Sequence, residues 1–173
     1  MTLPSAPEPQ DDRYYALGQV VELAAVMEIA LRMAFCALIG GRYAAVVAGW
    51  QETHWLIENC DAITRHRDDI PEPQRVAIRT SLRACREANQ DRNRLVHEAW
   101  GTGTDGTPAA LRSLDRSYQI IGRAWSTAQI RAAAEAISSA QYALLAAMED
   151  ALGSASMHEA AQLLAADAAE RGR

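Results

Sequence analysis

The chain has 173 residues, 49% of them apolar, which is enough for one folded domain with a sizeable core. The formal net charge of -5 argues against a protein whose whole surface grips nucleic acid, although it permits a local basic cleft. Lysine is absent, and all 17 residues counted as Lys or Arg are arginines. Each carries a planar guanidinium that can donate two parallel hydrogen bonds to a phosphate or a carboxylate. The longest stretch without a charged residue, Ala136–Met148, is too short for a membrane span of ~20 residues.

The N-terminal third predicts one long helix. Residues 1–11 contain three prolines and are expected to form a flexible arm. Asp11 or Asp12 then caps a helix that runs to about Ile39 and ends at Gly40–Gly41. Apolar residues recur in it at spacings of three and four, which predicts one buried face. That face comprises Leu17, Val21, Ala24, Leu31, Phe35 and Leu38, flanked by Val20, Met27 and Ala34.

Two further helices are predicted in the middle of the chain. The first spans about Arg42–Asn59, and its inward-facing residues are expected to be Val46, Val47, Trp50 and Ile57. The charged, proline-containing segment Asp61–Pro73 is predicted to be a loop. The next helix starts near Pro73, since proline suits the first turn, and continues to about His97 or Trp100.

The last third combines a hairpin signal with a capping signal. Asp105-Gly106 predicts a short hairpin or irregular loop, about Ala99–Thr104 against Thr107–Leu114. Ser126 and Gln129 match a capping box, which opens another helix that ends at Gly153. The apolar face of that helix is formed by Ile130, Ala134, Ile137, Leu144, Met148 and Leu152. The tail, residues 154–173, is compatible with a short helix.

These elements predict an all-α fold, an antiparallel four-helix bundle over residues 12–153. The first and third long helices are too apolar for the surface of a monomer, so we expect a homodimer formed through the long helices. The cysteines Cys36, Cys60 and Cys85 are odd in number and lack a CxxC motif, which argues against a zinc ribbon or a disulfide framework. We therefore expect buried thiols and a cytoplasmic protein.

The helix that starts near Pro73 has a break in its apolar stripe. The stripe is apolar at both ends and polar in the middle, and it runs Ile78, Leu82, Cys85, Asn89, Arg92/Asn93, Val96 and Trp100. His97 follows Asn93 by about one turn. Polar groups on a buried line cost free energy unless they are paired, and departures from a local pattern often mark functional sites.

The sequence Arg92-Asn93-x-x-x-His97 resembles the signature of the HEPN superfamily. That signature is an arginine, usually followed by a polar residue, and then a histidine after four to six intervening positions. The resemblance covers about Asp12–Leu152 and implies a homodimer with two Arg/His sets in one cleft. It also implies a metal-independent endoribonuclease of a toxin, phage-defence or RNA-processing system. Some members carry a tyrosine two positions after the histidine, where Ala99 stands here, so control by modification of that tyrosine is in doubt.

Metal-independent RNA cleavage needs a base for the 2′-hydroxyl proton, an acid for the leaving 5′-oxygen and positive charge on the phosphate. His97 is the candidate base or acid, because an unperturbed imidazole titrates near pH ~6.5. Arg92 is the candidate group for the phosphate oxygens. Asn93 is expected to orient the phosphate or the His97 ring, since residues four apart are neighbours on a helix. No cofactor and no metal are predicted.

Further residues are assigned supporting roles. Substrate binding is expected from Asn89, Arg94 and Trp100, the last by stacking on a base. Glu28, on the apolar stripe of the first helix, is expected to support the site by pairing with Arg32 or by reaching Arg92. The expected partners are a second copy of the chain, RNA as substrate and an antitoxin or regulatory protein, with no membrane.

Two alternatives stay open. The same polar residues also suit a dimer-interface network without turnover, in a non-catalytic HEPN-like module that binds a protein or a nucleotide. His54 and Glu58 stand one turn apart, which suits a metal, but no third ligand lies near them in the sequence. We interpret that pair as surface residues.

Overall fold

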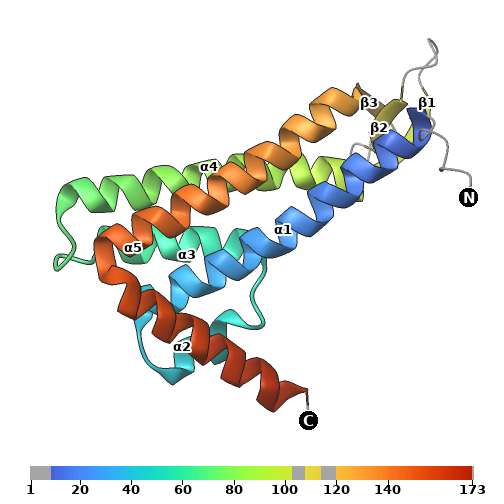
Figure 1. Cartoon of the computed structure of the whole chain (residues 1–173). Helices are drawn as coiled ribbons and strands as arrows, with labels where there is room; N and C mark the ends of the chain where they lie inside the picture. The colour runs from blue at the N-terminus through green and yellow to red at the C-terminus, as the bar shows by residue number, and fades with distance from the viewer. Residues whose placement is uncertain (1–8, 103–107, 114–119, 173) are drawn as a thin grey trace, which may run out of the picture.

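The computed structural model describes residues 9–102, 108–113 and 120–172, and the protein is mostly helical (Figure 1). In chain order the elements are α1 (Pro9–Ile39), α2 (Arg42–Ala48), α3 (Thr53–Arg65), α4 (Glu72–His97), β1 (Ala99–Thr102), β2 (Pro108–Ser113), β3 (Ile120–Ala124) and α5 (Thr127–Arg171). Helices α1, α3, α4 and α5 pack around one core, in which α1 lies along α5 and α3 contacts both α1 and α4. Among the described residues, no helix is long and apolar enough to cross a membrane.

Helix α1 begins earlier than the sequence predicted. It starts at Pro9, so the positions of Asp11 and Asp12 lie inside the helix and not at its N-cap. The part of the predicted arm before Pro9 lies outside the described residues. The predicted buried face is correct in outline, but Val21 is 49% exposed whereas Val20 is fully buried. Adjacent residues lie about 100° apart around a helix, so only one of the two valines can face the core.

The helix predicted over Arg42–Asn59 is in fact two helices, α2 and α3, separated by Gly49–Glu52. Helix α2 packs through its small residues, since its buried residues are Ala44, Ala45 and Ala48. The predicted inward face is therefore wrong in its first part and correct only at Ile57, which is fully buried. The exposed members are Val46, Val47 and Trp50.

Helix α3 extends into the segment predicted as a loop. Asp61 lies on its buried side and accepts hydrogen bonds from Arg65 and from Arg79 Nε, the latter at 2.9 Å. The charges in this segment therefore serve a helix–helix contact, and the loop is confined to the residues between Arg65 and Glu72.

Helix α4 matches its prediction, with Pro73 in the first turn. Helix α5 opens with the predicted capping box, in which Ser126 Oγ accepts from the Gln129 backbone N–H and Gln129 Oε1 accepts from the Ser126 backbone N–H. Gly153 interrupts α5 with φ +82° and ψ 155°. The tail then continues as a helix to Arg171, where the sequence is only compatible with a short helix.

A small antiparallel sheet in the order β1-β2-β3 follows α4 and lies at the end of the helices nearest the chain's N-terminus (Figure 1). The pairing of β1 with β2, with Trp100 opposite Ala110, agrees with the predicted hairpin. Its turn, including Asp105 and Gly106, lies outside the described residues. Strand β3 was not predicted, so the chain is not purely α-helical.

Candidate functional site

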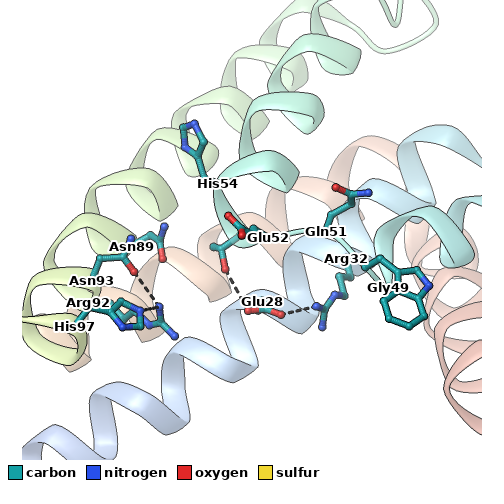
Figure 2. Close-up of a pocket in the computed structure, with 12 residues that line it drawn as sticks. Glu28, Arg32, Gly49, Gln51, Glu52, His54, Asn89, Arg92, Asn93 and His97 are labelled. Carbon is teal, nitrogen blue, oxygen red and sulfur yellow. Dashed lines mark hydrogen bonds and ion pairs between the residues drawn. The ribbon is translucent and has the colours of Figure 1, made fainter. Parts of the chain in front are cut away.

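A cavity of about 590 Å³ opens beside the C-terminal half of α4. Helix α1, the segment between α2 and α3 and the start of α3 form its other walls (Figure 2). The lining residues are Glu28, Arg32, Gly49, Trp50, Gln51, Glu52, Thr53, His54, Asn89, Arg92, Asn93 and His97. The volume falls in the range of ~300–1,000 Å³ that is usual for ligand cavities.

Arg92, Asn93 and His97 form one hydrogen-bonded cluster at this cavity (Figure 2). Arg92 Nη1 lies 2.9 Å from Asn93 Oδ1 and 3.1 Å from His97 Nε2. Because a guanidinium can only donate, Nε2 of His97 is the acceptor. This contact places the His97 ring nitrogen beside the Arg92 guanidinium.

No carboxylate in the described part of the chain neutralises the charge of Arg92. Its side chain is half-buried, and it has no carboxylate partner among the described residues. Neither partner of Nη1 is a carboxylate, Nη2 makes no hydrogen bond within the described part of the chain, and Nε is buried without a partner there. A partly buried guanidinium with unused donors is suited to bind an anion such as phosphate.

The neighbouring residues differ in how they join the cluster. Asn89, one turn before Asn93, is buried and lines the cavity. Asn93 and His97 are exposed, and both also border a second hollow of about 430 Å³. Arg94 lies at that second hollow and pairs with Asp91 at 3.0 Å. Arg94 is thus beside the cluster but outside the main cavity.

Trp100 is not among the residues that line either hollow. Its indole Nε1 donates to the Leu95 carbonyl oxygen at 2.9 Å, and its half-buried ring packs against the core. The guanidinium of Arg13 lies over the ring, 5.7 Å from its centre. The structure therefore places Asn89 at the same cavity as the cluster but does not place Trp100 there.

Glu28 lies on the opposite wall and pairs with Arg32, with Arg32 Nη2 at 2.5 Å from Glu28 Oε1. Thr53 Oγ1 donates to the other carboxylate oxygen at 3.2 Å, and Arg32 Nε donates to the Ala48 carbonyl at 3.2 Å. Of the two predicted partners of Glu28, the structure has Arg32. This pair is neutral overall. Its hydrogen bonds join α1 to the last residue of α2 and to the first residue of α3.

Seven lining residues were not predicted as site residues: Arg32, Gly49, Trp50, Gln51, Glu52, Thr53 and His54. Arg32 was named only as a partner of Glu28, and nothing in the local sequence links Trp50 or His54 to α4. Glu58, the suggested metal partner of His54, instead pairs with Arg86 at 2.7 Å. In the described ranges, no three His, Cys, Asp or Glu side chains are grouped so as to hold a metal ion.

Comparison with models of protein families, with characterised proteins and with solved structures finds no match to this chain. The cavity provides a guanidinium without a carboxylate partner among the described residues, an exposed imidazole and a side-chain amide within one network. Such a set can bind a phosphate and accept or return a proton beside it.

Proposed function

We propose that the protein is a metal-independent endoribonuclease of the HEPN type, with Arg92, Asn93 and His97 as its catalytic residues. The observation that supports this best is the Arg92 guanidinium, which is half-buried, lacks a carboxylate partner among the described residues and donates to the exposed imidazole of His97. Ribonuclease chemistry requires a cation for the phosphate and a proton acceptor next to it.

In the proposed reaction, an RNA phosphate takes up the free donors of Arg92. Arg92 then releases His97 Nε2, which accepts the proton of the adjacent 2′-hydroxyl. The 2′-oxygen forms a bond to phosphorus, and the bond from phosphorus to the 5′-oxygen breaks. A protonated imidazole gives its proton to that leaving oxygen. The products are a 2′,3′-cyclic phosphate and a 5′-hydroxyl, and the reaction uses no metal.

The acid for the leaving group is proposed to be His97 of the partner subunit, in a cytoplasmic homodimer of antiparallel four-helix bundles. The exposed side of α1 supports a dimer, because it carries large apolar side chains that water disfavours: Tyr14, Tyr15, Val21, Val26 and Ile29. Light scattering is expected to give twice the chain mass of 18.8 kDa for the wild type. Val21→Glu, which places like charges across the interface, is expected to give the monomer mass.

The biological role proposed for this activity is a toxin or defence nuclease held in check by an antitoxin or regulatory protein. The alternative function is a non-catalytic HEPN-like module. One observation favours the alternative, namely that both Nη1 hydrogen bonds of Arg92 are already satisfied inside the protein. In that case the network is structural, and its loss would lower stability without changing any RNA.

The test is incubation of the purified protein with a mixed RNA pool in EDTA, beside His97→Ala. His158→Ala is the matched control, because His158 is also an exposed helical histidine but lies in the tail part of α5. The proposal expects cleavage by the wild type and by His158→Ala, and none by His97→Ala. Intact RNA with the wild type, or equal cleavage by all three proteins, contradicts it.

A further inference from the structure

Trp50 is the most exposed large aromatic ring at the cavity, and neither the core nor the proposed reaction uses it. It lies in the break between α2 and α3, lines the cavity and is 75% exposed. An indole is costly to leave in water, because it carries ~150–250 Å² of surface that burial would remove from solvent. Its position at a cavity wall suggests that a ligand covers it.

The indole is held in place from the end of α5. The Arg171 guanidinium lies over the ring, 5.3 Å from its centre, and Arg171 in turn pairs with Asp167. Gly49 permits this approach, because a Cβ atom at that position would collide with the Arg171 guanidinium. The ring is still three-quarters exposed with Arg171 in contact, so a platform remains open.

The exposed apolar residues of α2 do not share this location. Tyr43, Val46 and Val47 are exposed on α2, but they do not line the cavity. Trp50, which follows α2, lines the same polar cavity as Arg92. This location favours a ligand with a flat apolar part and a charged part over a purely apolar protein surface.

One end of the cavity carries the exposed ring of Trp50, and the other carries the guanidinium of Arg92. In Figure 2, Gly49 and Gln51, which flank Trp50, lie beside Arg32 at the opposite end of the labelled residues from Arg92 and His97, with Glu28 between the two groups. Nucleotides combine a flat base with an anionic phosphate. Stacking of a base on an aromatic ring contributes to binding whatever the base, because every base has a π-face.

We infer that Trp50 is a stacking platform for the unpaired base of a nucleotide that neighbours the phosphate bound by Arg92. This inference rests on the proposed ribonuclease function and adds a specificity-determining residue to it. Because a duplex covers both faces of its internal bases, the platform selects single-stranded segments with little preference for base identity.

The test measures binding separately from cleavage. The probe is a fluorescein-labelled 2′-O-methyl RNA of about 12 nucleotides, single-stranded or annealed to its complement, since the blocked 2′-oxygen prevents the proposed reaction. Fluorescence anisotropy gives the dissociation constant for the full chain and for Trp50→Ala, Trp50→Leu and Trp50→Phe. Tyr142→Ala is the control, because Tyr142 is 67% exposed on α5 and does not line the cavity.

Single-strand affinity is expected to fall roughly tenfold or more in Trp50→Ala and Trp50→Leu. It should stay within about threefold of the wild type in Trp50→Phe, which keeps a flat ring. Tyr142→Ala should match the wild type, and the duplex should bind more weakly and not respond to the Trp50 variants. Trp50→Leu distinguishes best between the two kinds of contact. An apolar contact with a protein would tolerate leucine, whereas stacking on a base would not.

Equal single-strand affinity for the wild type and all Trp50 variants overturns the inference. It is also overturned if the Trp50 variants leave RNA affinity unchanged but lower the mass measured by light scattering. That result would assign Trp50 to a protein interface. If His97-dependent cleavage of ordinary RNA persists in either case, the proposed function stands and this inference alone fails. If binding depends on Trp50 but RNA is never cleaved, the nuclease proposal fails and the platform stands.

Discussion

Arg92 donates to His97 across the last turns of α4, with Nη1 3.1 Å from Nε2. Residues five apart in an α-helix lie about 140° apart around its axis, so they are not ordinary neighbours. The contact forms because the arginine side chain is long and because α4 ends at His97. In the proposed reaction, a phosphate that binds the unused donors of Arg92 draws the guanidinium away from the imidazole, so phosphate binding is expected to be coupled to release of the His97 nitrogen.

This coupling predicts a large effect of removing the Arg92 guanidinium. Arg92→Ala is expected to lower the rate of RNA cleavage by about 10²–10³-fold, the range found when one donor to a developing anion is removed. Arg83→Ala is the matched control, because Arg83 is an exposed arginine of the same helix that does not line the cavity. Initial rates on one RNA at equal protein concentration provide the comparison. Equal losses in both variants would indicate an effect of net charge and not of the site.

Two glycine substitutions are predicted to have opposite effects on stability. Gly153 adopts φ +82° and ψ 155°, a backbone region that is nearly restricted to glycine, so Gly153→Ala should lower the free energy of unfolding by about 1–3 kcal/mol. Gly18 lies in α1 with open space where a Cβ atom would stand, so Gly18→Ala should raise it by about 0.5–1 kcal/mol. Urea denaturation measures both. A higher free energy of unfolding in Gly153→Ala than in the wild type would contradict the non-helical backbone of Gly153.

Asp61 is predicted to make stability depend on acid. Burial alone would raise its pKa, but the Arg79 hydrogen bond and the charge of Arg65 outweigh burial and hold the pKa of Asp61 below its ordinary value. A lowered folded-state pKa stabilises the protein above the unfolded-state pKa, about pH 4, and this contribution is lost as the pH falls through the folded-state pKa.

Asp61→Asn should therefore lower the free energy of unfolding at pH 7 by about 1–3 kcal/mol, with the gap from the wild type closing in acid below about pH 4. The control is Asp68→Asn, whose almost fully exposed carboxylate pairs with Arg75 and should contribute little. Urea unfolding at neutral and acidic pH gives both differences. A gap that stays constant across this pH range would show that the Asp61 charge is not the cause.

The three cysteines are predicted to be unreactive in the folded protein. Burial raises the pKa of Cys36 to about 11 and the pKa of Cys60 and Cys85 to about 12. The thiolate is the reactive form, and all three side chains are buried. Labelling with a thiol reagent at about pH 8 should require denaturant. Rapid labelling of the native protein would show that the core opens near these residues.

The sequence predicted the long regular elements well. Helix α4 and the capping box at Ser126 follow from local signals, since periodicity, Pro73 and the Ser126/Gln129 pair act over one or two turns. The break after Ala48 was not foreseen, because the orientation of α2 depends on alanines that pack closely against other helices. Likewise, Asp61 looked like a loop residue, because its partner Arg79 comes from α4 and is distant in the sequence.

The predicted part of the site lies mainly on one helix, with Glu28 of α1 as the exception. Arg92, Asn93 and His97 stood out because they interrupt an apolar stripe, and the structure joins them by hydrogen bonds. The opposite wall comes from segments distant in the sequence, so no local pattern pointed to Trp50 or His54. Turnover of RNA by the cluster stays a prediction.

The most direct test of the ribonuclease proposal is mass spectrometry of the RNA ends after incubation in EDTA. The upstream fragments should carry a 2′,3′-cyclic phosphate and the downstream fragments a 5′-hydroxyl, and neither end should form with His97→Ala. Products with a 5′-phosphate, or the same cyclic phosphate ends from His97→Ala, would contradict the assignment of Arg92 and His97 as the catalytic pair.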